Sequence, residues 1–122
     1  MQYNSSMLSK KYRVKKFKDF DELFEKGDFK SASSFYIKYA ANNENYSRIS
    51  VVVPKKVAKL AITRNRIKRQ LSEIVRLKYK EIKPGYNVLI VCKSGVLEMQ
   101  YGQLDREWDY LLEKSGLNNK II

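Results

Sequence analysis

The chain has 122 residues, with 25 Lys and Arg against 13 Asp and Glu, which gives a net charge of +12 and a pI near 9.8. This length fits a single domain, and the excess of cations favours a polyanionic partner, nucleic acid before a membrane surface. Because there is no His and one Cys, Ser-His-Asp and Cys-His catalytic groups are excluded, as are zinc sites built on those residues. The sequence shows no apolar run long enough for a membrane span or a signal peptide, so we expect a cytoplasmic protein.

The N-terminal part of the chain predicts a tail and a short helix. Residues 1–9 are polar, show no period and are expected to be disordered. Residues 19–26 predict a helix, because Phe20, Leu23 and Phe24 follow helical spacing and a glycine comes directly after them.

The middle of the chain predicts two strands and a long helix. Residues 34–40 and 48–53 have the composition of strands, and the polar turn between them indicates a hairpin. A helix is predicted to begin between residues 57 and 64 and to run to about residue 82, with Thr63 as a candidate N-cap.

The C-terminal part predicts a strand and a last helix. Residues 87–93 predict a strand because 88–92 are apolar, and Cys92 is expected to be a buried strand residue rather than a reactive thiol. The last helix is predicted to end near Gly116, with an apolar face of Leu104, Trp108, Leu111 and Leu112. The order α, β, β, α, β, α predicts an α+β domain over residues 10–116, with 117–122 as a C-terminal tail.

Two basic blocks flank an acidic helix. Residues 1–18 hold six cations and no acid, and residues 48–80 hold eleven cations and one acid. On the predicted long helix, Ile67 and Leu71 begin an apolar face that Ile74 and Val75 complete. The opposite face is predicted to carry Asn65, Arg69, Arg76 and Lys80, with Arg66 beside them. This pattern is typical of an extended nucleic-acid surface rather than of one phosphate pocket.

One acidic group allows a metal hypothesis. Asp105, Asp109 and Glu113 lie at i, i+4 and i+8, and such an edge could hold a hydrated Mg²⁺ near nucleic acid. The alternative, which we favour, is an exposed helix face without a metal. We assign no metal site and no catalytic residue to the chain.

A composite motif carries a resemblance to a known family. Residues 48–57 read Arg-Ile-Ser-Val-Val-Val-Pro-Lys-Lys-Val, Lys59 and Ala61 follow, and residues 64–69 read Arg-Asn-Arg-Ile-Lys-Arg. This combination closely resembles the signature of the bacterial ribonuclease P protein subunit, and the similarity covers roughly residues 10 to 115. The chain departs from the family pattern at Pro54, Ala58 and Ser94.

The resemblance implies a fold and a function. The fold would be a small α/β sandwich in which a left-handed βαβ crossover carries the Arg-Asn-Arg helix. The protein would join a catalytic RNA as a 1:1 ribonucleoprotein with a monomeric protein, away from membranes. Together they would remove the 5′ leader of precursor tRNA by hydrolysis that depends on Mg²⁺ at the RNA active site.

The resemblance also implies two sets of binding residues. The set expected to bind the RNA subunit is Lys55, Lys56, Lys59, Arg64, Asn65, Arg66, Lys68 and Arg69. The set expected to bind the 5′ leader is Phe20, Phe24, one of Tyr36 and Tyr39, and, by a weaker match, Arg13, Lys15 and Lys16. Strand alternation puts the two tyrosines on opposite faces without deciding between them, and Phe20 and Phe24 could instead be core residues. Two other functions stay open at this point: a general, ribosomal-type RNA-binding protein without a role in cleavage, and a protein-only nuclease that uses the Asp105 edge.

Overall fold

The computed structural model describes residues 8–119 of the chain. In this range the helices are α1 (Phe17–Lys26), α2 (Ala61–Leu77) and α3 (Tyr101–Ser115). The strands are β1 (Asp28–Ser31), β2 (Phe35–Ala41), β3 (Arg48–Val52) and β4 (Tyr86–Cys92). Short 3₁₀ turns occur at Lys10–Tyr12, Tyr79–Glu81 and Ser94–Glu98. The predicted strands 34–40, 48–53 and 87–93 agree with β2, β3 and β4 to within one residue at each end.

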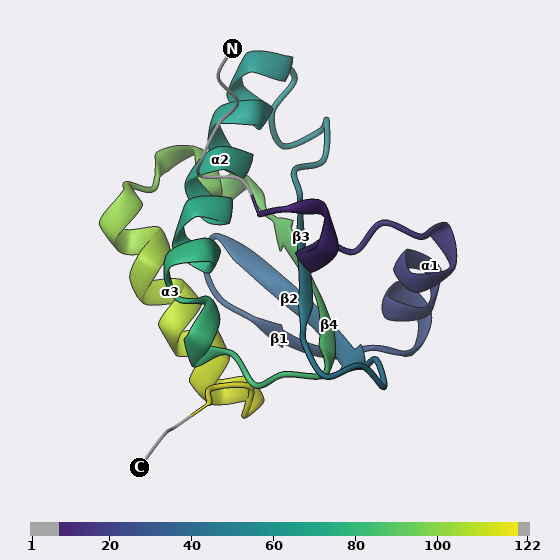
Figure 1. Cartoon of the computed structure of the whole chain (residues 1–122). Helices are drawn as coiled ribbons and strands as arrows, with labels where there is room; N and C mark the ends of the chain where they lie inside the picture. Colours follow the sequence, from purple (N-terminus) through teal and green to yellow (C-terminus); the bar gives the residue numbers. More distant parts are fainter. Residues whose placement is uncertain (1–7, 120–122) are drawn as a thin grey trace.

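The four strands form one mixed sheet between two layers of helix. The spatial order is β1-β2-β4-β3, in which β1, β2 and β4 are antiparallel neighbours and β3 is parallel to β4. Helices α2 and α3 cover one face of the sheet, and α1 lies against the other face, which we call the α1 face (Figure 1). The expected α+β fold is confirmed, and none of the helices in residues 8–119 has the length and apolar character needed to cross a membrane.

The predicted hairpin of β2 and β3 is wrong, because β4 lies between these two strands. The whole of Val88–Cys92 is buried, and a strand that is buried on both faces is stable in the middle of a sheet rather than at its edge. The chain therefore passes from β3 to β4 through the crossover helix α2. The left-handedness of this βαβ crossover stays a prediction from the resemblance. Strand β1 was not predicted, since its four residues are all exposed and show no apolar alternation.

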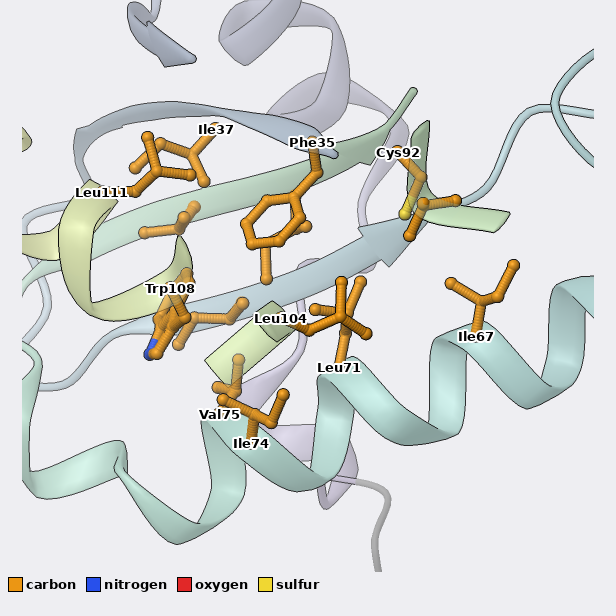
Figure 2. Packing of buried hydrophobic residues seen from close by; sticks show 14 of the residues in the cluster. Phe35, Ile37, Ile67, Leu71, Ile74, Val75, Cys92, Leu104, Trp108 and Leu111 are labelled. Carbon is orange, nitrogen blue, oxygen red and sulfur yellow. The ribbon is translucent and has the colours of Figure 1, made fainter. Parts of the chain in front are cut away.

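The main core fills the space between the sheet and helices α2 and α3 (Figure 2). In Figure 2, Ile67 of α2 points toward Cys92 of β4 and Leu71 toward Phe35 of β2, and all four residues of the predicted apolar face of α2 are buried, which confirms that face. Cys92 belongs to this core, as predicted, and burial raises the pKa of its thiol from 9.0 to about 12.

The ends of the helices differ from the prediction in physically interpretable ways. Helix α2 begins after Leu60, which makes no side-chain cap, so the predicted cap at Thr63, inside the helix, is wrong. Helix α3 stops at Gly116, whose φ of 76° is in the left-handed region that glycine adopts without strain. Leu117 then packs into the core and Asn118 bridges Ile82, so the folded unit extends beyond residue 116. Leu8 is also buried in the core, whereas residues 1–7 and 120–122 of the predicted tails lie outside the described residues.

A smaller apolar cluster joins α1 to the sheet. Its buried members are Val14, Leu23, Leu89 and Val91, and Phe20, Tyr36, Ala40 and Val52 pack against it partly exposed. Because α1 covers only part of this face, the α1 face keeps aromatic and apolar side chains open to solvent.

Candidate nucleic-acid interface

The first turns of α2 present cations on the surface opposite to the core. Asn65, Arg66 and Arg69 are exposed, whereas Ile67 between them is 2% exposed and anchors the helix to the sheet. A planar guanidinium can bind phosphate through two parallel hydrogen bonds, so Arg66 and Arg69 are suited to a polynucleotide backbone. The buried Ile67 holds this surface in a fixed position relative to the sheet.

Arg64 has a different environment from the other arginines. Its Nη1 donates to the carbonyl oxygens of Ala58 and Lys59, at 2.9 and 2.8 Å. These contacts tie the start of α2 to the preceding loop, in which Lys55, Lys56 and Lys59 are exposed. Arg64 therefore shapes the lysine-bearing loop with one edge of its guanidinium and leaves the other nitrogens for an external partner.

A cleft of about 500 Å³ connects the two predicted binding sets, and we call it the basic cleft. It lies between the N-terminal segment, α1 and α2, over the outer edge of β3. Its lining includes Arg13, Lys15 and Phe20 of the predicted leader set together with Lys68 of the predicted RNA-subunit set. The structure thus brings Lys68 of the RNA-subunit set into the same cleft as three residues of the leader set.

The N-terminal segment is held beside the basic cleft by a cluster of aromatic rings. Tyr12 packs edge-on against Tyr46 and Tyr79, with ring centroids 5.7 and 5.0 Å away. The hydroxyl of Tyr79 donates to the carbonyl oxygen of Ser47, and that of Ser50 donates to the carbonyl oxygen of Val14. These contacts fix the basic segment against β3 and so position its cations.

The cations of the N-terminal segment do not all face the same cleft. Arg13 and Lys15 line both the basic cleft and a neighbouring polar pocket of about 420 Å³, whereas Lys16 lines only the polar pocket. That pocket also contains Arg48 and Lys11, whose charged groups lie 5.1 and 4.8 Å from the ring centre of Tyr46. Sequence reasoning missed Lys11, Arg48 and Tyr46, because they come together only when the N-terminal segment packs against Tyr46 and β3.

A second hollow, the aromatic groove, crosses the α1 face and has a volume of about 590 Å³. Its walls are Phe24 of α1, Tyr36 of β2, Val91 of β4, Val52 of β3 and Lys56 of the following loop, with Lys93 nearby. Phe24 is 45% exposed, whereas Phe20 is more covered and packs against the small apolar cluster. Apolar and aromatic walls with cations at the rim suit the bases and phosphates of a single strand.

The structure separates the two tyrosines that the sequence left as alternatives. Tyr36 is partly exposed and lines the aromatic groove. Tyr39 is 7% exposed, lies in the main core on the opposite face of the sheet, and has a pKa that burial raises. Tyr39 cannot touch a ligand in the groove, so Tyr36 is the tyrosine that can.

The acidic edge of α3 is occupied by a side chain of the protein itself. The Lys78 ammonium lies 2.7 Å from Asp105 and 2.8 Å from Asp109, which ties α2 to α3. Burial lowers the pKa of Lys78, but hydrogen bonds to both carboxylates outweigh it and leave the pKa raised. Within residues 8–119, no group of three or more His, Cys, Asp and Glu is arranged to hold a metal ion. The contacts with Lys78 give Asp105 and Asp109 a structural role, which is to hold α3 against the end of α2.

Comparisons with known proteins find related sequences over most of the chain. The family model described as Ribonuclease P matches residues 8–116. A ribonuclease P protein component of Geobacillus kaustophilus is 36% identical over 110 residues, which cover 89% of this chain and 90% of that protein. One from Syntrophomonas wolfei is 31% identical over 111 residues, which cover 91% and 92%.

Solved structures show the same fold. The RNase P protein of Staphylococcus aureus superposes with a TM-score of 0.80 at 24% identity, covering 88% of this chain and 98% of that one. The RNase P protein of Thermotoga maritima gives 0.76 at 24% identity, covering 84% and 96%.

Proposed function

The chain belongs to the ribonuclease P protein family, and from this premise we propose that it is the protein subunit of a ribonuclease P ribonucleoprotein. In this proposal it binds the catalytic RNA and the 5′ leader of precursor tRNA and promotes removal of that leader. One observation carries the proposal beyond the family name: a basic surface for structured RNA and an aromatic groove for a single strand lie on either side of the same loop, residues 53–60.

The RNA subunit is assigned to the exposed cations of α2 and its preceding loop. Structured RNA is bound largely through phosphates and 2′-hydroxyl groups, which suits the guanidinium groups of Arg66 and Arg69 and the amide of Asn65. These side chains project from a helix whose other face is buried, so the helix holds the cations in fixed relative positions for binding to the RNA. Lys55, Lys56 and Lys59 extend this basic surface along the loop that Arg64 braces.

The leader is assigned to the aromatic groove and the basic cleft. Stacking of a base on Phe24 or Tyr36 tolerates any base, since every base has a π face, and a leader-binding surface has to accept varied sequences. Arg13, Lys15 and Lys68 of the basic cleft supply charge for the backbone beside the bases. Phe20 supports the groove from the apolar cluster beneath it.

The chemical step is assigned to the RNA and not to protein side chains. In this proposal Mg²⁺ acts at the RNA active site, and the protein supplies affinity for precursor tRNA. The sequence has no His, and Lys78 already binds two of the acids that could have served a protein-only nuclease. We further propose one protein per RNA in a cytoplasmic ribonucleoprotein.

A binding measurement tests the proposal against a general RNA-binding role. We would assemble the protein with a bacterial ribonuclease P RNA and measure Kd for precursor tRNA and for mature tRNA, in Ca²⁺ so that cleavage is slow. The proposal predicts that the protein tightens binding of the precursor and leaves binding of the mature tRNA nearly unchanged. Equal effects on both, or none on either, would favour a general RNA-binding protein.

A further inference from the structure

Resting on the proposed function, we infer that Phe29 of β1 is a further base-stacking residue that forms the outer end of the aromatic groove. Phe29 belongs to none of the predicted binding residues, and the strand that carries it was not predicted. The inferred ligand is a nucleobase of a single-stranded leader, bound beyond the position at Tyr36.

The sheet register places Phe29 on the same face as the groove. Phe29 is paired with Lys38, and Tyr36 is two residues from Lys38 on β2, so all three side chains are on the α1 face. The rings of Phe29 and Tyr36 have centroids 5.0 Å apart and planes tilted by 46°. The aromatic surface at Tyr36 therefore continues onto β1 without a break.

Phe29 is poorly explained as a core residue. It is 51% exposed and belongs to neither buried cluster of the described residues, and all four residues of β1 are exposed. Exposed apolar side chains on an edge strand promote aggregation, so these positions more often carry polar or charged residues. An aromatic residue that stays exposed there is therefore consistent with a ligand that covers it. The exposed part of the Phe29 side chain is accessible to a base.

Two lysines near Phe29 can bind the phosphates that accompany such a base. Lys38, across from Phe29, holds its Nζ 2.7 Å from the carbonyl oxygen of Phe24, at the end of α1. Lys93 donates to the hydroxyl of Ser31, two residues after Phe29, at 2.7 Å. Aromatic rings on a surface that also carries cations suit single-stranded nucleic acid, which they bind without sequence preference.

The position of Phe29 gives the groove a direction. The groove crosses the sheet from the Lys56 loop beside β3, over β4, to Tyr36 on β2, and the Phe29 ring, 5.0 Å from that of Tyr36, extends this surface onto β1. Under the proposed function the RNA subunit is bound at α2, next to the Lys56 end, and cleavage occurs on that RNA. The leader then enters at β3 and leaves at β1, so Phe29 meets the nucleotide farthest from the cleavage site.

Leader length is the variable that tests this inference. We would reconstitute holoenzymes with wild-type protein, Phe29→Leu, Phe29→Tyr and Tyr36→Leu, and with Tyr110→Ala as a control on another exposed aromatic residue. Tyr110 is 48% exposed, on α3 and thus on the other side of the sheet. For each holoenzyme, Kd would be measured with mature tRNA and with precursors whose leaders are shortened one nucleotide at a time.

The expected result is a loss that appears only with long leaders. Phe29→Leu keeps an apolar contact with Tyr36 but removes the ring, and should weaken binding of long-leader precursors roughly five- to tenfold, the lower part of the range for loss of one stacked base. For short-leader precursors and mature tRNA, the Kd of the Phe29→Leu holoenzyme should equal that of the wild-type holoenzyme. Phe29→Tyr and Tyr110→Ala should behave as wild type throughout, and thermal unfolding would verify that each variant is folded.

Failure of this inference is distinguishable from failure of the proposed function. If Phe29→Leu binds every precursor as wild type does while Tyr36→Leu does not, the role of Phe29 is refuted and the proposed function stands. Equal weakening for all substrates, mature tRNA included, also refutes it. If the wild-type holoenzyme itself does not distinguish precursor from mature tRNA, both proposals fall together.

Discussion

Replacement of Tyr36 and Tyr39 by leucine should separate leader binding from stability. Tyr36 lines the aromatic groove, and loss of one base stack costs about 1–3 kcal/mol, which is roughly 5- to 150-fold in Kd for precursor tRNA. A leucine at position 36 keeps part of the contact with the small apolar cluster. The free energy of unfolding of the Tyr36→Leu protein should therefore fall by less than about 1 kcal/mol. Tyr39 is 7% exposed in the main core, and Tyr39→Leu leaves an unfilled volume there that should cost about 1–3 kcal/mol.

Two assays on the same variants measure these effects. Urea unfolding can be followed through Trp108, the one tryptophan of the chain, which is fully buried and reports loss of the core. The ratio of Kd for mature and precursor tRNA, measured on assembled holoenzymes, reports the leader contact. Tyr36→Leu should change the ratio and barely move the urea midpoint, and Tyr39→Leu should do the reverse.

The reasoning would be refuted by a crossed outcome. A normal Kd ratio for Tyr36→Leu would mean that the aromatic groove does not bind the leader. A reduced ratio for a folded Tyr39→Leu protein, with Tyr36→Leu unaffected, would mean that the leader is recognised from the other face of the sheet. Tyr36→Phe serves as control, because it keeps the ring and should keep the ratio.

Three further predictions concern charge and packing. Arg66→Ala with Arg69→Ala should weaken binding to the RNA subunit and reduce the slope of log Kd against log salt by about one unit per arginine, without lowering thermal stability; an unchanged affinity and slope would remove both residues from the interface. Lys78→Met should lower the free energy of unfolding by about 0.5–1 kcal/mol through loss of its two aspartate contacts and leave RNA affinity intact, and urea unfolding at low and high salt would measure it. Burial raises the pKa of Cys92 from 9.0 to about 12, so above pH 9 the unfolded chain loses this proton while the folded chain keeps it, and stability falls by about 1.4 kcal/mol at pH 10. Cys92→Ala should flatten the decline between pH 8 and 10, and an equally steep decline in that variant would contradict the assignment.

Local periodicity was sufficient to predict that the three helices exist and which face of α2 is buried, but α2 ends at Leu77 and not near residue 82 as predicted. Ile67 and Leu71 lie where their spacing placed them, because a helix with one apolar stripe can be buried in only one orientation. The error at the β2–β3 turn arose because strand pairing depends on contacts distant in sequence. Whether β4 would insert between the two strands depends on the burial of Val88–Cys92 by both helical layers, which no short window reveals.

The sequence was sufficient to name most of the candidate binding residues, but not to predict how they are arranged. The motif identified Arg66 and Arg69, and the structure leaves both exposed. Alternation showed that Tyr36 and Tyr39 face opposite ways, but the choice between them depends on which face α1 covers. The contacts of Arg64 with two loop carbonyls have no sequence signal, since they depend on the path of residues 55–60.

The central claim, that the polypeptide assists a catalytic RNA, is tested most directly by reconstituted cleavage of precursor tRNA. Cleavage would be followed at low Mg²⁺ for a bacterial ribonuclease P RNA alone, for the protein alone, and for the two together. The account predicts strong stimulation of the RNA by the protein and no cleavage by the protein alone. Leader removal by the protein without RNA, or an RNA rate that the protein leaves unchanged, would contradict it.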